Sequence, residues 1–390
     1  MVKRLARAPI EAQSFEMCEH KGIGHPDTIV DGVCEAASRA LSLAYRERTG
    51  RIQHHNLDKG LLIAGTSVPR FGGGDLVDSA RIVICGRATR TALIEPREIA
   101  IAAARAYLQR HVRCARDVFG LDAQIRSGSA SLARVISAAR NAPLSNDTSF
   151  GVGFAPYSRL EKLVLDLAGI LKSEDFRRAF PAAGDDFKIM AFRAARAGAP
   201  VITLALALID RHVESVRHYY DVKHSIGAHL VQKLDQDVDL RINALDDPQA
   251  RDESGVYVTV SGLSAEMGDD GQVGRGNRVS GLITPNRPMS LEAAAGKNPV
   301  SHVGKLYNLL AMLIARDIHR ELPHMAEVSV QLLSAIGRPV DEPQAAVIEL
   351  AIEGKELERH AVRAREIARD WLRDIERVTE LVLSEEIAVY

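Results

Sequence analysis

The sequence lacks several features that would place it in a specialised class of proteins. It has four cysteines in 390 residues, far apart and without a C-x-x-C pair, which argues against structural zinc and a disulfide framework. Its 50 basic residues nearly balance its 51 acidic residues, so a basic field for nucleic acid is not expected. The longest apolar stretch, near Val201–Ile209, is too short to span a bilayer, and Met1–Ile10 lacks the apolar core of a secretory signal. We therefore expect a cytoplasmic protein without nucleic-acid or membrane partners.

The composition that remains is that of an ordinary globular chain, with 46% hydrophobic and 26% charged residues. A chain of this length exceeds what one hydrophobic core usually fills, so two or three subdomains are expected. Apolar residues at helical spacing predict a helix from Pro26 or Asp27, a second over Glu95–Val112 and a long one over Glu356–Glu385. Strands are predicted at Leu61–Ala64, Arg81–Cys85, Val201–Ile209, Val256–Val260 and Val328–Ala335. Helices and strands do not alternate strictly, which favours an α+β fold over a doubly wound sheet.

The first segment that could carry chemistry is Gly24–Asp27, at the start of the first predicted helix. A helix N-terminus presents unpaired N–H groups and the positive end of the helix dipole, both of which favour anions. His25 could donate a hydrogen bond to a phosphate oxygen, and Asp27 could bind Mg²⁺, which prefers carboxylate oxygen. The alternative is that Asp27 only satisfies the first turn of the helix and His25 is a turn residue.

Three further segments have weaker signals when each is taken alone. His54–Gly60 could supply a metal or phosphate ligand, although a polar strand edge explains it nearly as well. Asn146–Gly153 could place an aspartate against an adenine or a substrate ammonium group. Strand alternation in Asp185–Lys188 would put Asp186 and Lys188 on one face, where the lysine could meet a phosphate. The competing interpretation of this last pair is a surface ion pair of little energetic value.

The strongest segment is Gly268–Lys297, which we call the glycine-rich segment. Its first eleven residues, Gly268–Arg278, contain four glycines, two adjacent carboxylates and two arginines. A solvated loop has little need of so many glycines beside charged groups. Backbone N–H groups and cationic side chains in such a loop could surround a polyphosphate. The segment therefore predicts an enzyme that grips a magnesium-bound nucleoside triphosphate.

Taken together and in this order, the segments resemble the archaeal-type S-adenosylmethionine synthetases (methionine adenosyltransferases), and the resemblance covers most of the chain. The matching stretches are Lys21–Asp27, His54–Gly60, Pro69–Gly74, Asn146–Ala155, Ser264–Lys305 and Gln331–Pro343. The resemblance implies an α+β fold with three similar subdomains around a pseudo-threefold axis, their mixed sheets covered by helices on one side. We place the subdomain regions approximately at residues 1–145, 146–255 and 256–390, and expect them to be discontinuous. It also implies a homodimer or dimer of dimers with active sites between subunits.

The resemblance further implies a reaction between ATP and L-methionine. Methionine sulfur attacks C5′ of ATP, giving S-adenosylmethionine and triphosphate, which is then hydrolysed to diphosphate and phosphate. Mg²⁺ is required in this family, and K⁺ commonly assists. Cations must stabilise the growing charge of the leaving triphosphate, and the sulfur must be held in line with C5′. A thioether has no proton to lose, so the absence of a Ser–His–Asp pattern is expected.

The family motifs assign roles to individual residues of this sequence. The catalytic group would be His25, Lys188, Arg275 and Lys297. ATP and methionine would be bound by Asp147, Asp186, Asp269 and Asn298, with Arg278 added as a phosphate cation because of its proximity. The metal ligands would be Asp27 and Asp58.

The sequence also departs from the better-known bacterial and eukaryotic branch of the family. That branch has lysines where this chain has Gly276 and Ser301, and an aspartate where it has Val303. The second metal ligand therefore stays open among three acids: Asp58, Asp270 and Glu292. The acid that contacts K⁺ in that branch falls near His54, which weighs against a K⁺ requirement. Two other functions stay open: adenosyl transfer to a methionine analogue, and a nucleotide-binding subunit without turnover.

Overall fold

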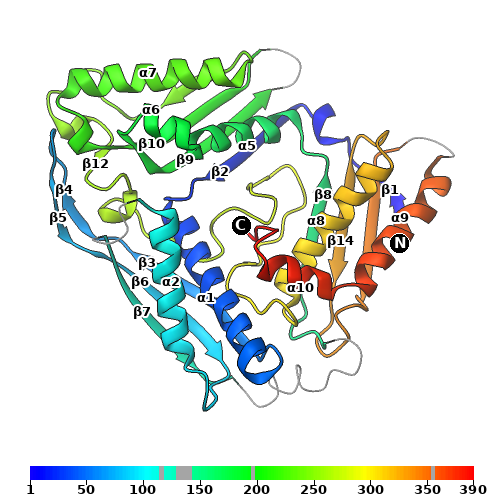
Figure 1. Cartoon of the computed structure of the whole chain (residues 1–390). Coiled ribbons are helices and arrows are strands. Elements are labelled where there is room, and N and C mark those ends of the chain that lie inside the picture. Colours follow the sequence, from blue (N-terminus) through cyan, green and yellow to red (C-terminus); the bar gives the residue numbers. More distant parts are fainter. Residues whose placement is uncertain (114–117, 129–142, 195–197, 353–355) are drawn as a thin grey trace.

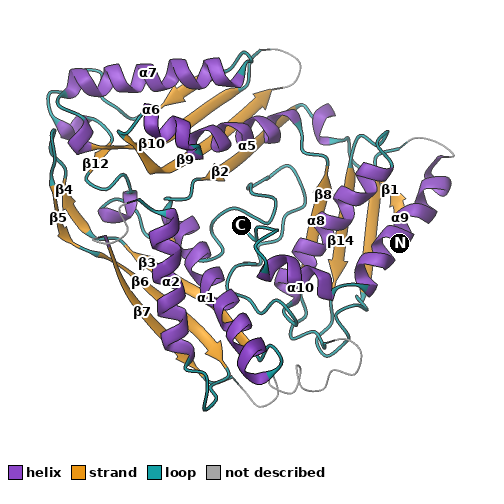
Figure 2. Ribbon diagram, viewed as in Figure 1, coloured by secondary structure: helices purple, strands orange, loops and turns teal. Residues whose placement is uncertain are grey.

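The computed structural model describes residues 1–113, 118–128, 143–194, 198–352 and 356–390. The chain forms three units, each a β-sheet with helices packed against it, arranged as a triangle (Figure 1, Figure 2). The long segment around residues 260–300 and the C-terminal end of the chain lie in the middle of the triangle (Figure 1). This arrangement confirms the predicted α+β class.

The first unit contains a four-stranded mixed sheet covered by two helices. Its strands, in order across the sheet, are β13 (Gly271–Gln272), β3 (His55–Ile63), β6 (Ala80–Ala88) and β7 (Phe119–Arg126). Its helices are α1 (Pro26–Thr49) and α2 (Pro96–His111). A separate hairpin joins β4 (Thr66–Val68) to β5 (Asp75–Asp78). Alternate residues of β6, among them Ile82 and Ile84, are fully buried in the core that α1 and α2 share.

The second unit has its own hydrophobic core, formed by one sheet and three helices. Its strands are β11 (Asp239–Ile242), β10 (Val201–Ile209), β9 (Ala183–Ala194) and β2 (Phe15–Lys21), with the short β12 (Val258–Thr259) beside β10. Its helices are α5 (Arg159–Lys172), α6 (Glu174–Ala179) and α7 (Val216–Leu234). Because β2 follows β1 along the chain yet pairs with β9, this sheet draws on segments far apart in the sequence.

The third unit joins strands from both ends and the middle of the chain. Its strands are β1 (Val2–Arg4), β15 (Ala345–Leu350), β14 (Val328–Leu333) and β8 (Phe150–Ala155). Its helices are α8 (Val303–Glu321), α9 (Glu356–Arg373) and α10 (Glu376–Leu383). Gly151 and Gly153 let β8 approach α8 closely, because a Cβ at these positions would lie 2.1 and 2.2 Å from backbone carbons of the helix.

Most of the predicted elements are present, with two corrections. The strand predicted at Val201–Ile209 has the same bounds as β10. The single long helix predicted over Glu356–Glu385 was wrong: it is divided at residues 374–375 into α9 and α10. Neither proline nor glycine occurs at this break. The change of direction lets α10 contact α1 and α8, while α9 packs on α8 and β1. The strand predicted at Val256–Val260 is reduced to the two residues of β12.

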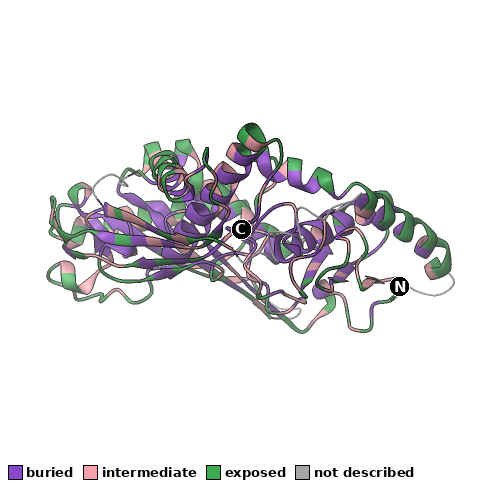
Figure 3. Ribbon diagram, turned by 90° about the horizontal axis from the view of Figure 1, so that it is seen from below, coloured by how far each residue is buried: buried purple, intermediate pink, exposed green. Residues whose placement is uncertain are grey.

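Each sheet leaves one face uncovered by its own helices, and these faces carry exposed apolar side chains. They include Leu61 on β3, Met190 and Phe192 on β9, and the cross-strand pair Phe150 and Leu333, all between 36% and 47% exposed. Seen edge-on, the molecule is a flattened body with its buried residues in the middle (Figure 3). No helix within the described ranges is long and apolar enough to cross a membrane.

Candidate active site

The connection between β2 and α1 places His25 beside strand β9. The backbone N–H groups of Gly22 and Gly24 donate to the carbonyls of Phe187 and Asp185, at 2.7 and 2.9 Å, and so extend the pairing of β2 with β9. A side chain at Gly24 would meet the backbone of Asp185 at 2.4 Å, so only glycine permits this approach. Pro26 then begins α1 in the first helical position, where its missing N–H costs nothing.

His25 caps α1 and is held in one tautomer. Its Nδ1 accepts a hydrogen bond from the backbone N–H of Asp27 at 3.2 Å. Burial, followed by the charge of Lys21, lowers the pKa of His25 to about 4, although Asp27 acts in the opposite direction. The imidazole is therefore neutral near pH 7, and its proton is on Nε2. His25 can thus donate a hydrogen bond from Nε2 without carrying a charge.

Two lysines face each other across neighbouring strands beside His25. Lys21 on β2 and Lys188 on β9 are direct partners in the antiparallel register. Glu19 lies between them, 3.8 Å from the Lys21 ammonium and 3.4 Å from that of Lys188. Like charges directly opposite on a sheet are destabilising. Glu19 offsets this repulsion, and Lys188, whose side chain is 43% exposed, is the lysine of the pair that lines the adjacent cleft.

A cleft of about 370 Å³ opens beside these groups on the uncovered face of the second sheet. Its lining includes His25, Asp186, Lys188, Tyr257, Met267 and Asp269. Asp186 accepts hydrogen bonds from the backbone N–H and the hydroxyl of Ser264. Burial raises the pKa of Asp186 to about 7, with a further contribution from Asp269, and burial together with Asp27 raises the pKa of Asp269. This concentration of acids beside lysines suits a ligand that carries both a cation and an anion, such as a magnesium-bound nucleotide or an amino acid.

The glycine-rich segment lies against α1 and along one edge of β3. Gln272 donates its backbone N–H to the Asp27 carboxylate at 2.9 Å, and Lys21 binds the other carboxylate oxygen at 2.8 Å and the carbonyl of Arg275 at 2.7 Å. The Arg275 side chain is exposed, and no ion pair involves it within the described part of the chain. Its guanidinium is therefore available to an anion.

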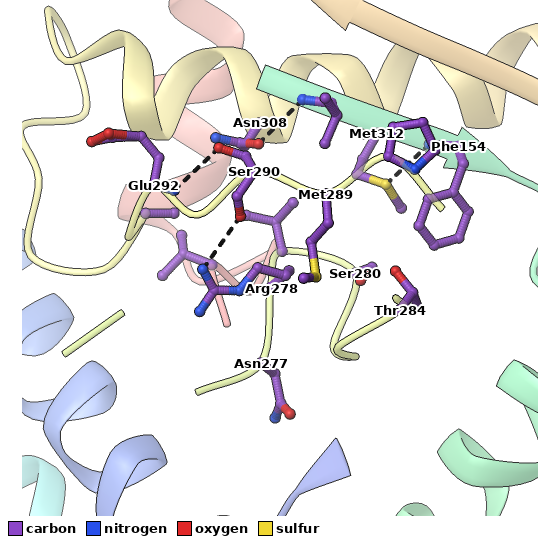
Figure 4. Close-up of a pocket in the computed structure, with 15 residues that line it drawn as sticks. Phe154, Asn277, Arg278, Ser280, Thr284, Met289, Ser290, Glu292, Asn308 and Met312 are labelled. Atoms are coloured by element: carbon purple, nitrogen blue, oxygen red, sulfur yellow. Dashed lines mark hydrogen bonds between the residues drawn. The ribbon is translucent and has the colours of Figure 1, made fainter. Parts of the chain in front are cut away.

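Arg278 points inward instead of toward the cleft. Its guanidinium donates to the carbonyls of Gly274, Gly276 and Ser290, at 2.5, 2.8 and 3.4 Å. It lines a small cavity between the glycine-rich segment, β8 and α8, whose lining also includes Met289 and Phe154 (Figure 4). In this position Arg278 holds the backbone of the segment, while its predicted role as a phosphate cation stays a prediction.

Lys297 belongs to a second group of charges. Its ammonium lies 2.6 Å from Glu292 and 3.5 Å from Asp58, and Asp58 also pairs with Lys59 at 2.8 Å. Burial would raise the pKa of Asp58, but the Lys59 and Lys297 ammonium groups hold it below its ordinary value. Of the three acids considered for the second metal ligand, Asp58 and Glu292 thus meet around Lys297. The third, Asp270, accepts a hydrogen bond from the backbone of Ala64.

Asn298 and Asp147 lie on the Lys297 side of the molecule. The side chain of Asn298 is 1% exposed and is used internally: its oxygen accepts from two following backbone N–H groups and its amide donates to the carbonyl of Gln53. Asp147 accepts from the backbone of Thr148, and the preceding residue, Asn146, donates its N–H to the carbonyl of Ser301. The structure thus places Asp147 and Asn298 near each other through the Asn298–Ser301 turn.

The predicted site residues therefore form two groups within one chain. The first contains four residues that line the cleft, His25, Asp186, Lys188 and Asp269. Lys21 joins Asp27 and Arg275 to this group by binding the Asp27 carboxylate and the Arg275 carbonyl. The second contains Asp58, Asp147, Lys297 and Asn298. The pairings of Leu61 with Gln272 and of Asn56 with Lys297 lie five positions apart on β3, or roughly 16 Å along the strand.

Within the described ranges, no cluster of three or more His, Cys, Asp or Glu side chains is arranged to hold a metal ion. Mg²⁺ usually binds through one or two carboxylates together with substrate phosphates. Asp27, in the first turn of α1 beside two lysines, could supply such a carboxylate to a metal that arrives with the nucleotide.

Sequence reasoning missed several residues of the site. Glu19 and Lys21 are brought beside Lys188 by the register of β2 on β9. Lys21 begins the matching stretch Lys21–Asp27, but no role was predicted for it. Asp31 and Glu35 had a readable signal, because with Asp27 they recur every four residues and therefore share one face of α1.

The neutral state of His25 leads to a pH prediction. With a pKa of about 4, only about 3% of the imidazole would be protonated at pH 5.5. We therefore expect the ratio of kcat/KM between the wild-type chain and His25→Asn to stay constant between about pH 8 and pH 5.5, because kcat/KM reports the free enzyme. Initial rates in a constant-ionic-strength buffer series measure this ratio. A step in the ratio near pH 6.5 would mean that His25 titrates with its ordinary pKa.

Comparisons with known proteins identify relatives along the whole chain. The family model for S-adenosylmethionine synthetase (AdoMet synthetase) matches residues 1–386. The S-adenosylmethionine synthase of Pyrococcus furiosus is 46% identical over the whole of this chain and 99% of its own length. That of Methanothermobacter thermautotrophicus is 41% identical with the same coverage.

A solved structure shares the fold at low sequence identity. It is an S-adenosylmethionine synthetase from Campylobacter jejuni, described as unusual, with a TM-score of 0.61 and 13% identity, which covers 93% of this chain and 89% of that one. At this identity the likeness concerns the fold alone. The family resemblance and the fold class predicted from the sequence are thus confirmed.

Proposed function

The chain belongs to the S-adenosylmethionine synthetase family, and we propose that its cleft binds the triphosphate of magnesium-bound ATP while methionine sulfur attacks C5′. The observation that carries this proposal is the cleft itself, which is lined by both the Lys188 cation and the neutral N–H donor of His25.

The chemistry requires stabilisation of charge and alignment, without a general base. As the bond from C5′ to oxygen breaks, negative charge grows on the triphosphate, and fixed donors and cations that meet this charge lower the barrier. His25 supplies an N–H donor, Lys188 and Arg275 supply cations, and Asp27 is the proposed carboxylate ligand of the magnesium that accompanies ATP. Asp186 and Asp269 are proposed to hold the nucleotide and the methionine ammonium group, so that the sulfur is in line with C5′.

The two groups of site residues support a site shared between two chains. Roughly 16 Å along β3 separates the part of the glycine-rich segment beside Asp27 from Lys297, more than one lysine side chain bridges. The uncovered sheet faces carry exposed apolar residues, as expected of surfaces that pack together in an oligomer. We propose a homodimer in which the His25 group of one chain meets the Lys297 group of the other.

Three further parts of the proposal have other grounds. The division of the chain into subdomain regions near residues 1–145, 146–255 and 256–390 rests on the family resemblance. A cytoplasmic location rests on the sequence, which has no apolar secretory core or spanning stretch, and activity without a strict need for K⁺ rests on the departure near His54.

The proposed function is tested by product analysis of the purified chain with ATP, methionine and Mg²⁺. Mass spectrometry is expected to show S-adenosylmethionine, diphosphate and phosphate in equal amounts, because each ATP gives one of each. Competing thioethers at equal concentration then test the acceptor. A strong preference for a thioether other than methionine would replace the methionine assignment, and binding of ATP without any product would favour a non-catalytic subunit.

A further inference from the structure

One face of α1 carries three acids at successive turns, which we call the carboxylate ladder: Asp27, Asp31 and Glu35. Every member accepts a backbone N–H from the glycine-rich segment. The donors are Gln272 at 2.9 Å, Gly274 at 2.7 Å and Gly296 at 2.9 Å. Residues four apart lie above one another on a helix, so one rigid element holds both ends of the segment.

We propose that Asp31 and Glu35 are positioning residues that fix the two ends of the glycine-rich segment on α1, and thereby set the places of Arg275 and Lys297. This inference rests on the proposed function, because it assumes that Arg275 and Lys297 contact the triphosphate. Asp27 belongs to the same ladder but also faces the cleft, so its substitution would mix two effects.

Asp31 and Arg278 hold the turn around Arg275 from two sides. Asp31 accepts a hydrogen bond from the N–H of Gly274, whereas Arg278 donates hydrogen bonds to the carbonyls of Gly274 and Gly276. Gly274 has a φ of +85°, which glycine adopts without strain, and a Cβ at Gly276 would lie 2.2 Å from Asp31 Oδ2. The turn is therefore pressed against the carboxylate, and the Arg275 side chain leaves from a backbone with little freedom.

The burial of Asp31 also needs an explanation that stability does not supply. Asp31 is only 2% exposed, its Oδ1 accepts the N–H of Gly274, and the backbone of Gly276 faces the same carboxylate. Burial raises the pKa of Asp31 to about 7, as expected for a carboxylate that is costly to bury. A role in holding the catalytic turn accounts for an acid at this position.

Glu35 ties the far end of the segment to two units of the fold. Its carboxylate accepts the N–H of Gly296. Both carboxylate oxygens also accept from the ammonium group of Lys305 on α8, at 2.7 and 2.8 Å. Lys305 is fully buried, so replacing Glu35 would leave a buried ammonium without its counter-charge and would disturb folding. Asp31 is therefore the better position for a test.

The test is a kinetic double-mutant cycle between Asp31 and Arg275 in the full-length chain. We expect Asp31→Ala to lower kcat by about 30-fold, with a smaller change in KM, because the turn loses an anchor that orients a transition-state contact. In the Arg275→Ala background the same change is expected to cost less than about threefold, because Asp31 acts through Arg275. Asp31→Asn keeps an acceptor for Gly274 and is expected to stay within about threefold of the wild-type rate.

The control is Ser225→Ala on α7, whose hydroxyl donates to the carbonyl four residues earlier, of Asp221, at 2.8 Å and which belongs to neither group of site residues. It should leave kcat unchanged, and thermal unfolding of every variant reports loss of fold. If Asp31→Ala does not fold, Gly276→Ala replaces it, because its methyl group would displace the turn from Asp31.

The outcomes separate the two proposals. A wild-type rate for Arg275→Ala would overturn the proposed clamp itself. An impaired Arg275→Ala together with equal costs of Asp31→Ala in both backgrounds would overturn the positioning role alone. The positioning role would also be overturned if Asp31→Asn were as slow as Asp31→Ala, because the charge of Asp31 and not its hydrogen-bond acceptor would then matter.

Discussion

Replacing Lys188 with alanine is expected to lower kcat for S-adenosylmethionine formation by about 10²–10³-fold, the usual effect of removing one preorganised group that meets developing charge. The fold should not change, because the Lys188 side chain is 43% exposed and its ion pair with Glu19 is 3.4 Å long. Exposed pairs of this kind contribute at most about 1 kcal/mol to stability. Lys188→Arg restores the charge but not the compact ammonium, so we expect only partial activity.

The measurement combines product formation with urea unfolding of the same preparations. Lys233→Ala, which removes a lysine from the surface of α7, is the control for a loss of one positive charge away from the cleft. If Lys188→Ala keeps most of the wild-type rate, Lys188 is only a surface cation, which was the competing interpretation of its motif.

Local signals in the sequence predicted the parts of the site that one segment builds by itself. The order Gly24, His25, Pro26 and Asp27 combines a close approach, a cap, a proline at the first helical position and an acid in the first turn, and the helix begins there. The glycine-rich segment likewise lies beside the cleft because its composition permits close backbone contacts. In both cases the physical cause lies within a few residues.

Side-chain direction could not be predicted, because it depends on partners that are distant in the sequence. Arg275 and Arg278 are three residues apart in the same glycine-rich segment. The Arg275 side chain is exposed, whereas the Arg278 guanidinium donates to three backbone carbonyls. Asn298 follows a predicted catalytic lysine, but its side-chain amide donates a hydrogen bond to the carbonyl of Gln53, 245 residues away along the chain. Only the fold brings these carbonyls within reach.

The register of strands is a second source of information absent from local sequence. Lys21 opposes Lys188 because β2, near the N-terminus, pairs with β9 of the central part of the chain. The break between α9 and α10 is similar, since it serves contacts with α1 and α8 and has no glycine or proline to mark it. The carboxylate ladder differs from both. Its four-residue spacing is visible in the sequence, whereas the backbone N–H groups that it binds are known only from the fold.

The separation of the two charge groups leads to the second large effect, a restoration of activity. Lys188→Ala and Lys297→Ala chains, each inactive alone, are expected to regain activity when they assemble together. In a mixed dimer one shared site would combine both substituted residues, and the other would contain wild-type residues only. Each mixed dimer would have one of its two sites intact, so the isolated mixed dimer is expected to show about 50% of the wild-type rate. An unfractionated random mixture, in which about half of the dimers are mixed, would show about 25%.

The two chains would be co-expressed with different tags, and the mixed dimer isolated by sequential affinity steps before the product assay. Chains carrying both substitutions, assembled with wild-type chains, give the matched control, because their mixed dimers would have one defect in each shared site and stay inactive. If the site lies within one chain, the pattern reverses: the two single variants give no active site together, whereas the double variant leaves its wild-type partner active. This reversal decides between a shared and an internal site, because each arrangement restores activity in the combination where the other does not.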